Sequence, residues 1–358
     1  MIPSSLTDAD LAGGLKWEAL VSSWRGTRYL GDVPVAGGSV TWSTSREVQG
    51  SLDLLVPRRM GRDWLPGRDV LHPLACKGQS LAVTIRTSTL VSQRVDIFPV
   101  GRFGIAEWQD EGGTIRVSGL SMGQRLVDDG FTSPMSARIG GTLASELRRL
   151  IPASLGLRIS PLLADRAVPK MSWGDSRMDA IKELLAAWPA RMREDGEGNL
   201  QVLPPLPDAT APVARLHDGP GGTVVTAYGS DTRQGIHNIV VARGQDMTDS
   251  GIPAYQAVAE QSTGPYAVAD YGRVVRYFSS PLITSQHACQ ASADTMLANS
   301  IRPASAEPLT MAPDPRLQMD DPVSVVSDGG RTRLGYVSGY QLPLVADSDM
   351  RVDVEVVA

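Results

Sequence analysis

The segment GLSMG at residues 119–123 is the part of the sequence that most resembles a catalytic motif. In a nucleophile elbow, two glycines let a serine occupy a strained turn between a strand and a helix, where its hydroxyl meets a histidine base. A short strand is expected before Ser121 and a short helical stretch after it. The candidate bases are His217, His237 and His287. A hydrolase with Ser121 as its nucleophile is therefore one hypothesis.

The wider context of this motif favours a structural turn. The strands before it alternate like antiparallel strands, whereas a nucleophile elbow stands at the top of a largely parallel sheet. No glycine-rich oxyanion segment with a histidine lies upstream, and the helical stretch ends at Gly130. A pattern with three fixed letters also arises readily in a chain with 36 Gly. We therefore assign no catalytic residue and expect a protein that is not an enzyme.

Two pairs of residues, His72 with Cys76 and His287 with Cys289, contain side chains that bind zinc. Neither spacing matches a zinc finger or knuckle, so we expect no metal site. Cys289 lies in an Ala-rich segment and is expected to pack as a small apolar residue. Two cysteines are too few for a disulfide framework, which leaves one buried pair or two free thiols open. No Walker A or dinucleotide fingerprint is present, and we expect no cofactor.

The stretch PDPRLQMDDPVSVV, residues 313–326, contains Asp314, Asp320 and Asp321 just before an alternating apolar run. Aspartate is favoured in turns because its carboxylate accepts hydrogen bonds from nearby backbone N–H groups, and Pro322 can begin a strand without a ladder donor. We interpret these acids as turn residues. The acidic segment 195–199 lacks the glycine and the bidentate glutamate of an EF-hand, which indicates a solvated turn. A glycosidase with two distant carboxylates stays open.

Composition indicates a globular protein without a strong affinity for nucleic acid. The chain has 358 residues, enough for two or three domains, and a net charge of −5. A protein that binds duplex DNA normally carries a clustered basic surplus, which is not visible here. Only four of the 34 basic residues are Lys, a skew that suggests a GC-rich coding source. No secretory signal and no apolar run of about 18 residues is present, so we expect a soluble cytoplasmic product.

The hydrophobic pattern predicts a mainly β protein with an α+β insert. A first strand is predicted at residues 24–30, and alternating runs predict further strands at 39–45, 51–57 and 80–88 and a hairpin over 101–119. Apolar residues at helical spacing follow Thr142 and Ser176, which are candidate N-caps of two short helices. Strands at 236–244 and 271–280, a helix at 284–299 and a β tail follow.

These elements define the predicted domains. They are an N-terminal segment (1–37), a first β-barrel domain (38–135), a small α/β insert (136–207) and a second β-rich barrel domain with one helix (208–358). Prolines at 204, 205 and 207 form the best linker in the chain. Two β-barrel-like domains would then flank a small helical domain, an order that excludes a doubly wound or TIM-barrel enzyme.

The two β-rich parts share a loose order of elements. In the first, Leu74 and a turn at 77–78 precede strands at 80–88, 102–108 and 114–118. In the second, Leu317 and the turn at 320–321 precede strands at 323–326, 334–340 and 351–357. Sequence identity between them is minimal. A duplicated barrel is a hypothesis, since antiparallel meanders often look alike.

Several segments of the sequence, taken in order along the chain, resemble segments of a known protein family. They are VTWSTSREVQGSLDLLVP, FPVGRFGIAEWQDEGGTIRVSGLSMGQRLVDDGFTSP, MSWGDSRMDAIKELLAAWPARMREDGEGNLQVLP, IHNIVVARG and PDPRLQMDDPVSVV. From Val40 to the C-terminus the chain resembles minor tail proteins of siphophages that infect actinobacteria, which are tail-hub or baseplate-hub proteins. The Asp320-Asp321 pair departs from the Gly-Asp expected there, which leaves the local turn type open. Ser121 stands where the family tends to have a polar or acidic residue, which disfavours a nucleophile.

The resemblance implies a homotrimer at the tip of the virion tail, assembled in the host cytoplasm. Three subunits with two similar barrels each would present six tube-like domains to the tail tube. The implied partners are the distal tail or tail tube protein, the C-terminus of the tape measure protein and a tip or fibre protein. A ring around a DNA conduit should not grip phosphate, and the acidic balance agrees with that expectation. A carbohydrate-binding adhesin stays open, because Trp24 or Trp64 could stack on sugars.

Overall fold

The computed structural model describes residues 1–89, 94–207, 211–219, 221–227, 236–244, 253–280, 283, 285–300, 306–326 and 332–357. The chain divides into two compact units. Unit 1 comprises residues 1–168, 172–229 and 306–355, and unit 2 comprises residues 169–171, 230–305 and 356–358. Each unit is described by itself. No helix in the described ranges is long and apolar enough to span a membrane.

Unit 1 contains a sheet of 13 strands. Seven of them come from the first part of the chain and follow one another in the order β3, β4, β9, β8, β7, β1, β2. Their bounds are β1 (Leu15–Arg25), β2 (Arg28–Val33), β3 (Gly37–Ser43), β4 (Gly50–Pro57), β7 (Gln79–Thr89), β8 (Val95–Asp110) and β9 (Thr114–Ser121). Alternate residues of β4 are buried, among them Leu52, Leu54 and Val56, as the sequence pattern predicts.

The first strand differs from the prediction at residues 24–30. The chain turns within that range, because β1 ends at Arg25 and β2 begins at Arg28. Gly26 has φ of 62°, a left-handed conformation that glycine adopts without steric cost and that a tight turn requires. The β1 strand begins at Leu15, and its alternation is hidden in the sequence because the apolar Leu20 is exposed and the polar Ser23 is buried.

The second part of the chain supplies six strands to the same sheet. They are β15 (Ala214–His217), β16 (Val224–Ala227), β20 (Ala306–Met311), β21 (Pro322–Val326), β22 (Thr332–Pro343) and β23 (Met350–Val357). Their order is β16, β20, β23, β22, β21, β15. All described pairs among them are antiparallel except β15 with β21.

The two halves of this sheet repeat one topology. When six strands of each half are numbered along the chain, with β2 left out, both halves place them in the spatial order 2-3-6-5-4-1. The fifth strand is β8 in the first half and β22 in the second, and the second strand is β3 and β16 respectively. One departure is that β1 pairs antiparallel with β7, whereas β15 pairs parallel with β21. The repeated order supports the duplication that the sequence suggested.

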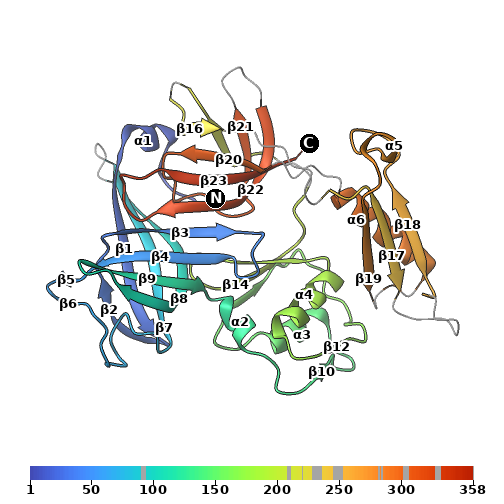
Figure 1. The fold of residues 1–358 in the computed structure, drawn as a ribbon, viewed down its shortest axis with the longest axis horizontal. Coiled ribbons are helices and arrows are strands. Elements are labelled where there is room, and N and C mark those ends of the chain that lie inside the picture. The colour runs from blue at the N-terminus through green and yellow to red at the C-terminus, as the bar shows by residue number, and fades with distance from the viewer. Residues whose placement is uncertain are drawn as a thin grey trace. The chain divides into compact units, whose positions relative to one another are not determined.

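In the strands that the structure describes, the halves are joined edge to edge and neither half forms a closed barrel. Strand β22 of the second half pairs with β3 of the first, so the blue and red strands lie side by side in Figure 1. Among the described residues, the path of paired strands stays open between β16 and β2. The expectation of two separate barrels therefore gives way to one continuous, mainly β sheet, because a strand of each half pairs across the boundary instead of closing its own half.

The insert between the halves belongs to unit 1 apart from residues 169–171. Helix α2 (Gln124–Asp128) precedes the insert, whose helices are α3 (Leu143–Leu150) and α4 (Arg177–Ala187). Its three-stranded sheet consists of β11 (Leu157–Ile159), β14 (Leu200–Leu203) and β13 (Arg191–Glu194). Two bonded strands, β10 (Met135–Ser136) and β12 (Ser172–Trp173), complete it. The side chains of Thr142 and Ser176 accept hydrogen bonds from backbone N–H groups three residues on, which confirms both predicted N-caps.

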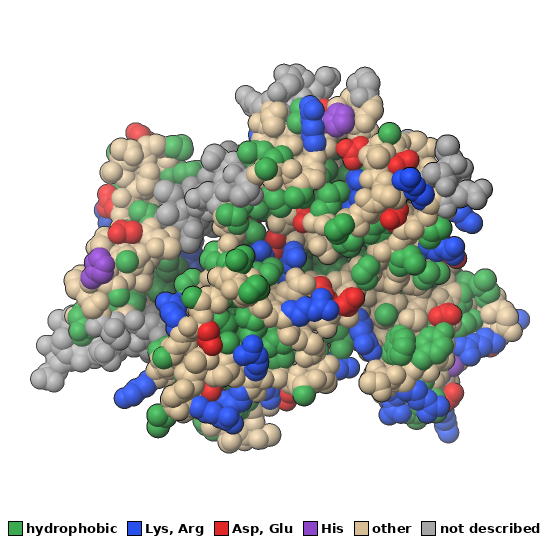
Figure 2. Space-filling model, turned by 180° about the vertical axis from the view of Figure 1, so that it is seen from behind, with side chains coloured by type: hydrophobic (Ala, Val, Ile, Leu, Met, Phe, Trp, Pro, Cys, Tyr) green, Lys and Arg blue, Asp and Glu red, His purple; other side chains and the backbone are tan. Residues whose placement is uncertain are grey.

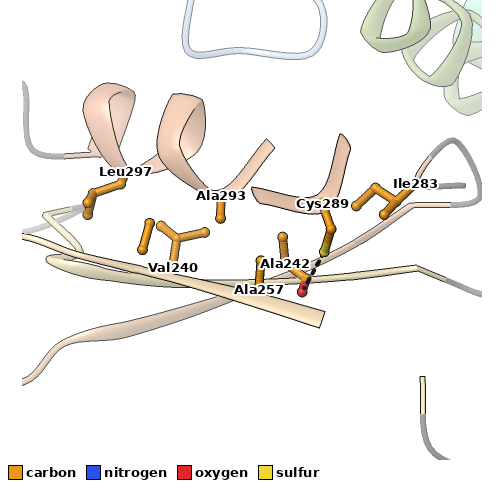
Figure 3. Close-up of a cluster of buried hydrophobic side chains, with 8 residues drawn as sticks. Val240, Ala242, Ala257, Ile283, Cys289, Ala293 and Leu297 are labelled. Carbon is orange, nitrogen blue, oxygen red and sulfur yellow. Dashed lines mark hydrogen bonds between the residues drawn. The ribbon is translucent and has the colours of Figure 1, made fainter. Parts of the chain in front are cut away.

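Unit 2 packs a helix on one face of a small sheet. The sheet consists of β18 (Gln256–Glu260), β17 (Ile239–Gly244) and β19 (Val275–Ser280), and its helices are α5 (Val268–Tyr271) and α6 (Gln286–Ser300). Small buried residues, including Ala242, Ala257 and Ala293, let α6 lie close to the sheet (Figure 3). The helix predicted at 284–299 is confirmed as α6, while its candidate N-cap, Thr284, lies outside the described residues.

Candidate assembly site

Ser121 is a buried structural residue at the end of β9. Its side chain is 1% exposed, and its hydroxyl donates a hydrogen bond of 2.6 Å to Oε1 of Glu194 on β13. The backbone N–H of Gly50 donates to the same hydroxyl at 3.2 Å. These described partners are a carboxylate and a backbone amide, not a histidine. A hydroxyl this deeply buried has no room for a polymer substrate, so the GLSMG segment is a strand-to-helix turn.

Glu194 joins the insert to the first half of the sheet. Its Oε1 also accepts the backbone N–H of Gly123 at 3.0 Å, while its Oε2 is buried without a hydrogen-bond partner. Burial raises the pKa of this carboxyl above its ordinary value, although the bonds from Ser121 and Gly123 oppose the shift. The backbone N–H of Glu194 donates to the side chain of Gln49 at 3.3 Å. Sequence patterns gave no indication of Glu194, because its partner lies more than 70 positions away.

The candidate histidine bases lie on other elements. His217 is the last residue of β15, where it is paired in register with Val326. His237 and His287 belong to unit 2. The structure therefore assembles no Ser–His pair at Ser121 from the contacts that it describes.

The histidine and cysteine residues considered as zinc ligands make separate contacts within the chain. Both cysteines are free thiols. The Cys289 thiol is buried and donates to the carbonyl oxygen of Ala242 at 3.3 Å (Figure 3). Nδ1 of His72 accepts the backbone N–H of Leu74, and burial raises the pKa of the Cys76 thiol. Within the described ranges, no group of three or more His, Cys, Asp and Glu side chains could hold a metal ion.

The acidic segment at 195–199 forms a turn, as predicted. One carboxylate oxygen of Asp195 accepts the backbone N–H groups of Glu197 and Asn199 at 3.0 and 2.9 Å. Arg158 forms ion pairs with the exposed side of this turn at Asp195 and Glu197. These bonds use the carboxylates that an EF-hand would offer to calcium.

The aspartates of residues 313–326 form a buried junction, which is more than the predicted turn. Asp314 is paired with Arg316, and both are buried. Asp320 is paired with Arg191 of the insert, and Asp321 accepts a bond from the N-terminal amine of Met1. Asp320 has φ of 66°, the left-handed conformation that a glycine would normally take at this turn. The acids therefore connect three distant parts of unit 1.

The two tryptophans considered for sugar binding are engaged within the chain. Trp24 donates its ring N–H to Ser22 at 2.9 Å and packs edge-on against Tyr29. Trp64 is buried, and the guanidinium of Arg62 stacks 3.9 Å above its ring. The ring of Trp64 is therefore closed to a carbohydrate, whereas the ring of Trp24 is half-buried.

The pair of β22 with β3 shows how one half of the sheet binds another. Residues 339–343 pair antiparallel with residues 39–43. Two further backbone bonds extend the pair, from Thr44 to Ser338 at 2.8 Å and from Leu344 to Gly38 at 2.9 Å. Trp42 of β3 is 2% exposed and donates its ring N–H to the carbonyl of Val100 at 3.1 Å. The backbone bonds hold the two halves in register, while Trp42 packs β3 against β8 of its own half.

Several strand edges of unit 1 have no described neighbour. Strands β16, β15 and β2 each have a described neighbour on one side only. Two longer strands are unpaired over part of one edge: residues 105–110 of β8 extend beyond β7, and residues 15–20 of β1 extend beyond β2. The unpaired part of β1 lies beside a groove of about 840 Å³. Unpaired strand edges readily accept a strand of another chain. On the face seen in Figure 2, Lys and Arg side chains lie in several separate groups with acidic side chains between them. These edges make unit 1 a candidate assembly site.

Comparisons with known proteins identify the fold. The tail protein from Neisseria meningitidis MC58 superimposes with a TM-score of 0.68 at 15% identity, over 94% of this chain and 96% of that chain. The 43 kDa tail protein of prophage MuSo2 from Shewanella oneidensis gives a TM-score of 0.65 at 13% identity, over 94% and 98%. Prophage tail protein gp18 from Listeria monocytogenes EGD-e gives 0.58 at 10% identity, over 94% of each. Searches of protein families and of curated protein sequences give no match. The chain therefore has the fold of these tail proteins over nearly its whole length.

Proposed function

We propose that the chain is the structural hub of a siphophage tail, of the type found in phages of actinobacteria. Three copies form a ring at the distal end of the tail tube. The ring adapts the six-fold tube to a three-fold tip and lets the DNA pass. The protein would act in the virion tail tip after assembly in the host cytoplasm.

The observation that supports this proposal most strongly is the likeness of the whole fold to tail proteins of three bacterial hosts. The match covers 94% of this chain in each case, so it includes both halves of the sheet, the insert and unit 2. A likeness confined to one small β domain would carry far less weight, since antiparallel β domains serve many functions.

The repeated topology supports the change of symmetry. Each chain carries two halves with the same strand order, so three chains supply six similar modules to a six-fold tube. We propose that each half acts as a barrel-like tube module once the neighbouring copies are present. We also propose the domain boundaries predicted from the sequence, after residues 37, 135 and 207. The insert at 136–207 then lies between the two modules along the chain.

The charge of the chain suits a DNA conduit. Its net charge is −5, and a lumen without a basic surplus does not retain phosphate as the genome passes. The proposed partners are the distal tail or tail tube protein above, the C-terminus of the tape measure protein within, and a tip or fibre protein below. We propose no enzymatic activity, since Ser121 is buried against Glu194.

Reconstitution with the tail proteins tests this function. Purified chain, mixed with tail tube protein and distal tail protein, should cap one end of each tube in negative-stain images. A virion assembled without the chain should lack a tip and fail to infect. Tails that assemble and infect normally without it would contradict the proposal.

A further inference from the structure

We infer that neighbouring copies join through a strand pair that repeats the β22–β3 pair of the single chain: residues 105–110 of β8 in one copy bind β16 of the next. The inference rests on the proposed ring and names the strands that hold it together. Four observations carry it, namely the repeated topology, two free edges and a pocket.

The first free edge belongs to β8, the counterpart of β22. Strand β22 divides its length, because residues 332–336 pair with β21 and residues 339–343 pair with β3. Strand β8 pairs residues 95–104 with β7 in the same way. Its residues 105–110 have only β9 as a described neighbouring strand, although the Cys76 thiol interacts with the Trp108 backbone, and Ala106, Glu107 and Gln109 are exposed. The segment that corresponds to the bound part of β22 is thus without its strand.

The second free edge belongs to β16, the counterpart of β3. Strand β16 pairs with β20 as β3 pairs with β4. On its other side, where β3 receives β22, β16 has no neighbour in the described part of the chain. Its Val225 is 64% exposed, and the strand carries no charge or proline of the kind that protects natural sheet edges.

A pocket marks the unfilled site beside β8. The loop before β7, residues 66–70 and 75–77, lines it together with Trp108 of β8, and its volume is about 400 Å³. In the second half, the corresponding loop before β21 lies beside β22 at residues 315 and 317–319. There Trp42 of β3 and Tyr340 of β22 line a space of only about 20 Å³, which residues of β8 and of the insert also close. The space beside this loop is thus nearly closed in the second half, where a strand is bound, and open in the first half, where none is.

These two edges make a head-to-tail contact. Each chain offers one β8 edge and one β16 edge, which differ, so the contact is heterologous and continues from copy to copy until a ring closes. Each new contact repeats the direction of the contact inside the chain. In the ring, intra-chain and inter-chain pairs would alternate around six modules.

Cysteine cross-linking tests this pair in the full chain. Gln109→Cys and Val225→Cys are combined in a Cys76→Ser background, since Cys289 is buried, and treated with a short bismaleimide. Denaturing gels should show dimers and closed trimers for the double variant and only monomer for each single variant. A matched control replaces Val225→Cys with Leu162→Cys, an exposed position on the insert, and should remain monomeric.

Charge variants give a second readout that needs no cross-linker. Val225→Asp would bring a carboxylate toward Glu107 of the neighbour and should weaken self-association about tenfold or more, whereas Val225→Lys should not. Leu162→Asp is the control. A three-copy ring that yields no more cross-link than the Leu162 control, and that Val225→Asp leaves intact, would overturn the strand pair but not the hub. A chain that stays monomeric throughout and also fails to bind tail tube protein would overturn both.

Discussion

The hydroxyl of Ser121 donates a hydrogen bond of 2.6 Å to the carboxylate of Glu194, and this contact ties the end of β9 to β13 of the insert. The two residues lie in parts of the chain that the sequence assigned to different domains. The bond is buried, so water cannot replace it, and removing one partner leaves the other without a hydrogen bond. The residue that most resembles a nucleophile is thus part of the connection between the insert and the sheet.

Ser121→Ala should lower the stability of the protein without removing any enzymatic activity. The variant leaves the N–H of Gly50 and one oxygen of Glu194 with fewer bonds, which should cost about 1–3 kcal/mol in the free energy of unfolding. Urea denaturation measures the loss, with exposed Ser348→Ala as the control. Zymography on cell walls tests the alternative. Clearing by the wild type that is absent with Ser121→Ala would contradict a structural role and support a hydrolase with Ser121 as its nucleophile.

Glu194→Gln should change how stability depends on pH. Burial raises the pKa of Glu194 above 4.5, so the folded state holds its proton more tightly than the unfolded state. Its contribution is then fully present below pH 4.5 and is lost as the pH rises through the folded pKa. The variant should therefore gain stability relative to the wild type as the pH rises above 4.5.

Chemical denaturation at a series of pH values measures this difference. Exposed Glu197→Gln, three residues away, is the matched control and should give a difference near zero at each pH. A constant offset between Glu194→Gln and the wild type across the series would show that the folded and unfolded states bind this proton equally, and would contradict a raised pKa of Glu194.

Asp320→Ala should be more destabilising than Asp320→Asn. Both variants remove the charge that faces Arg191, but asparagine tolerates the left-handed backbone at φ of 66° better than alanine does. The difference should be about 1–2 kcal/mol in favour of asparagine. Thermal and urea unfolding of the two variants side by side measure it, and equal stabilities would mean that the turn relaxes to another conformation.

Much of this fold could be predicted from the sequence, since its signals are local. Alternation identified the strands of residues 39–57 and 80–88, and capping residues identified α3 and α4. The ordered elements around Leu74 and Leu317 also indicated the repeat, which the common strand order supports.

The remaining features depend on contacts between distant residues. The pair of β22 with β3 joins residues about 300 positions apart, and no local pattern encodes which strand an edge will accept. For the same reason two barrels were expected where one continuous sheet is present. Glu194 and Arg191 gave no signal, because their types are ordinary for a strand and only burial opposite Ser121 and Asp320 gives them their roles.

Gly339→Ala should disrupt the pair that joins the halves. A Cβ atom at this position would lie 2.9 Å from the backbone oxygen of Trp42, so the two strands would have to separate. We expect a loss of about 1–3 kcal/mol in stability. Gly104→Ala on β8 is the matched control, because its Cβ would meet its nearest neighbour at 3.8 Å. Equal effects of the two substitutions in urea denaturation would contradict a close-packed β22–β3 pair.

The mass of the purified chain in solution tests the central claim most directly. Light scattering on a concentration series, without any other tail protein, measures it. If the chain is a hub, a trimer of three times 38.2 kDa should be present, and its fraction should increase with concentration as the fraction of monomer falls. A mass of 38.2 kDa at every concentration, together with failure to bind tail tube protein, would contradict it.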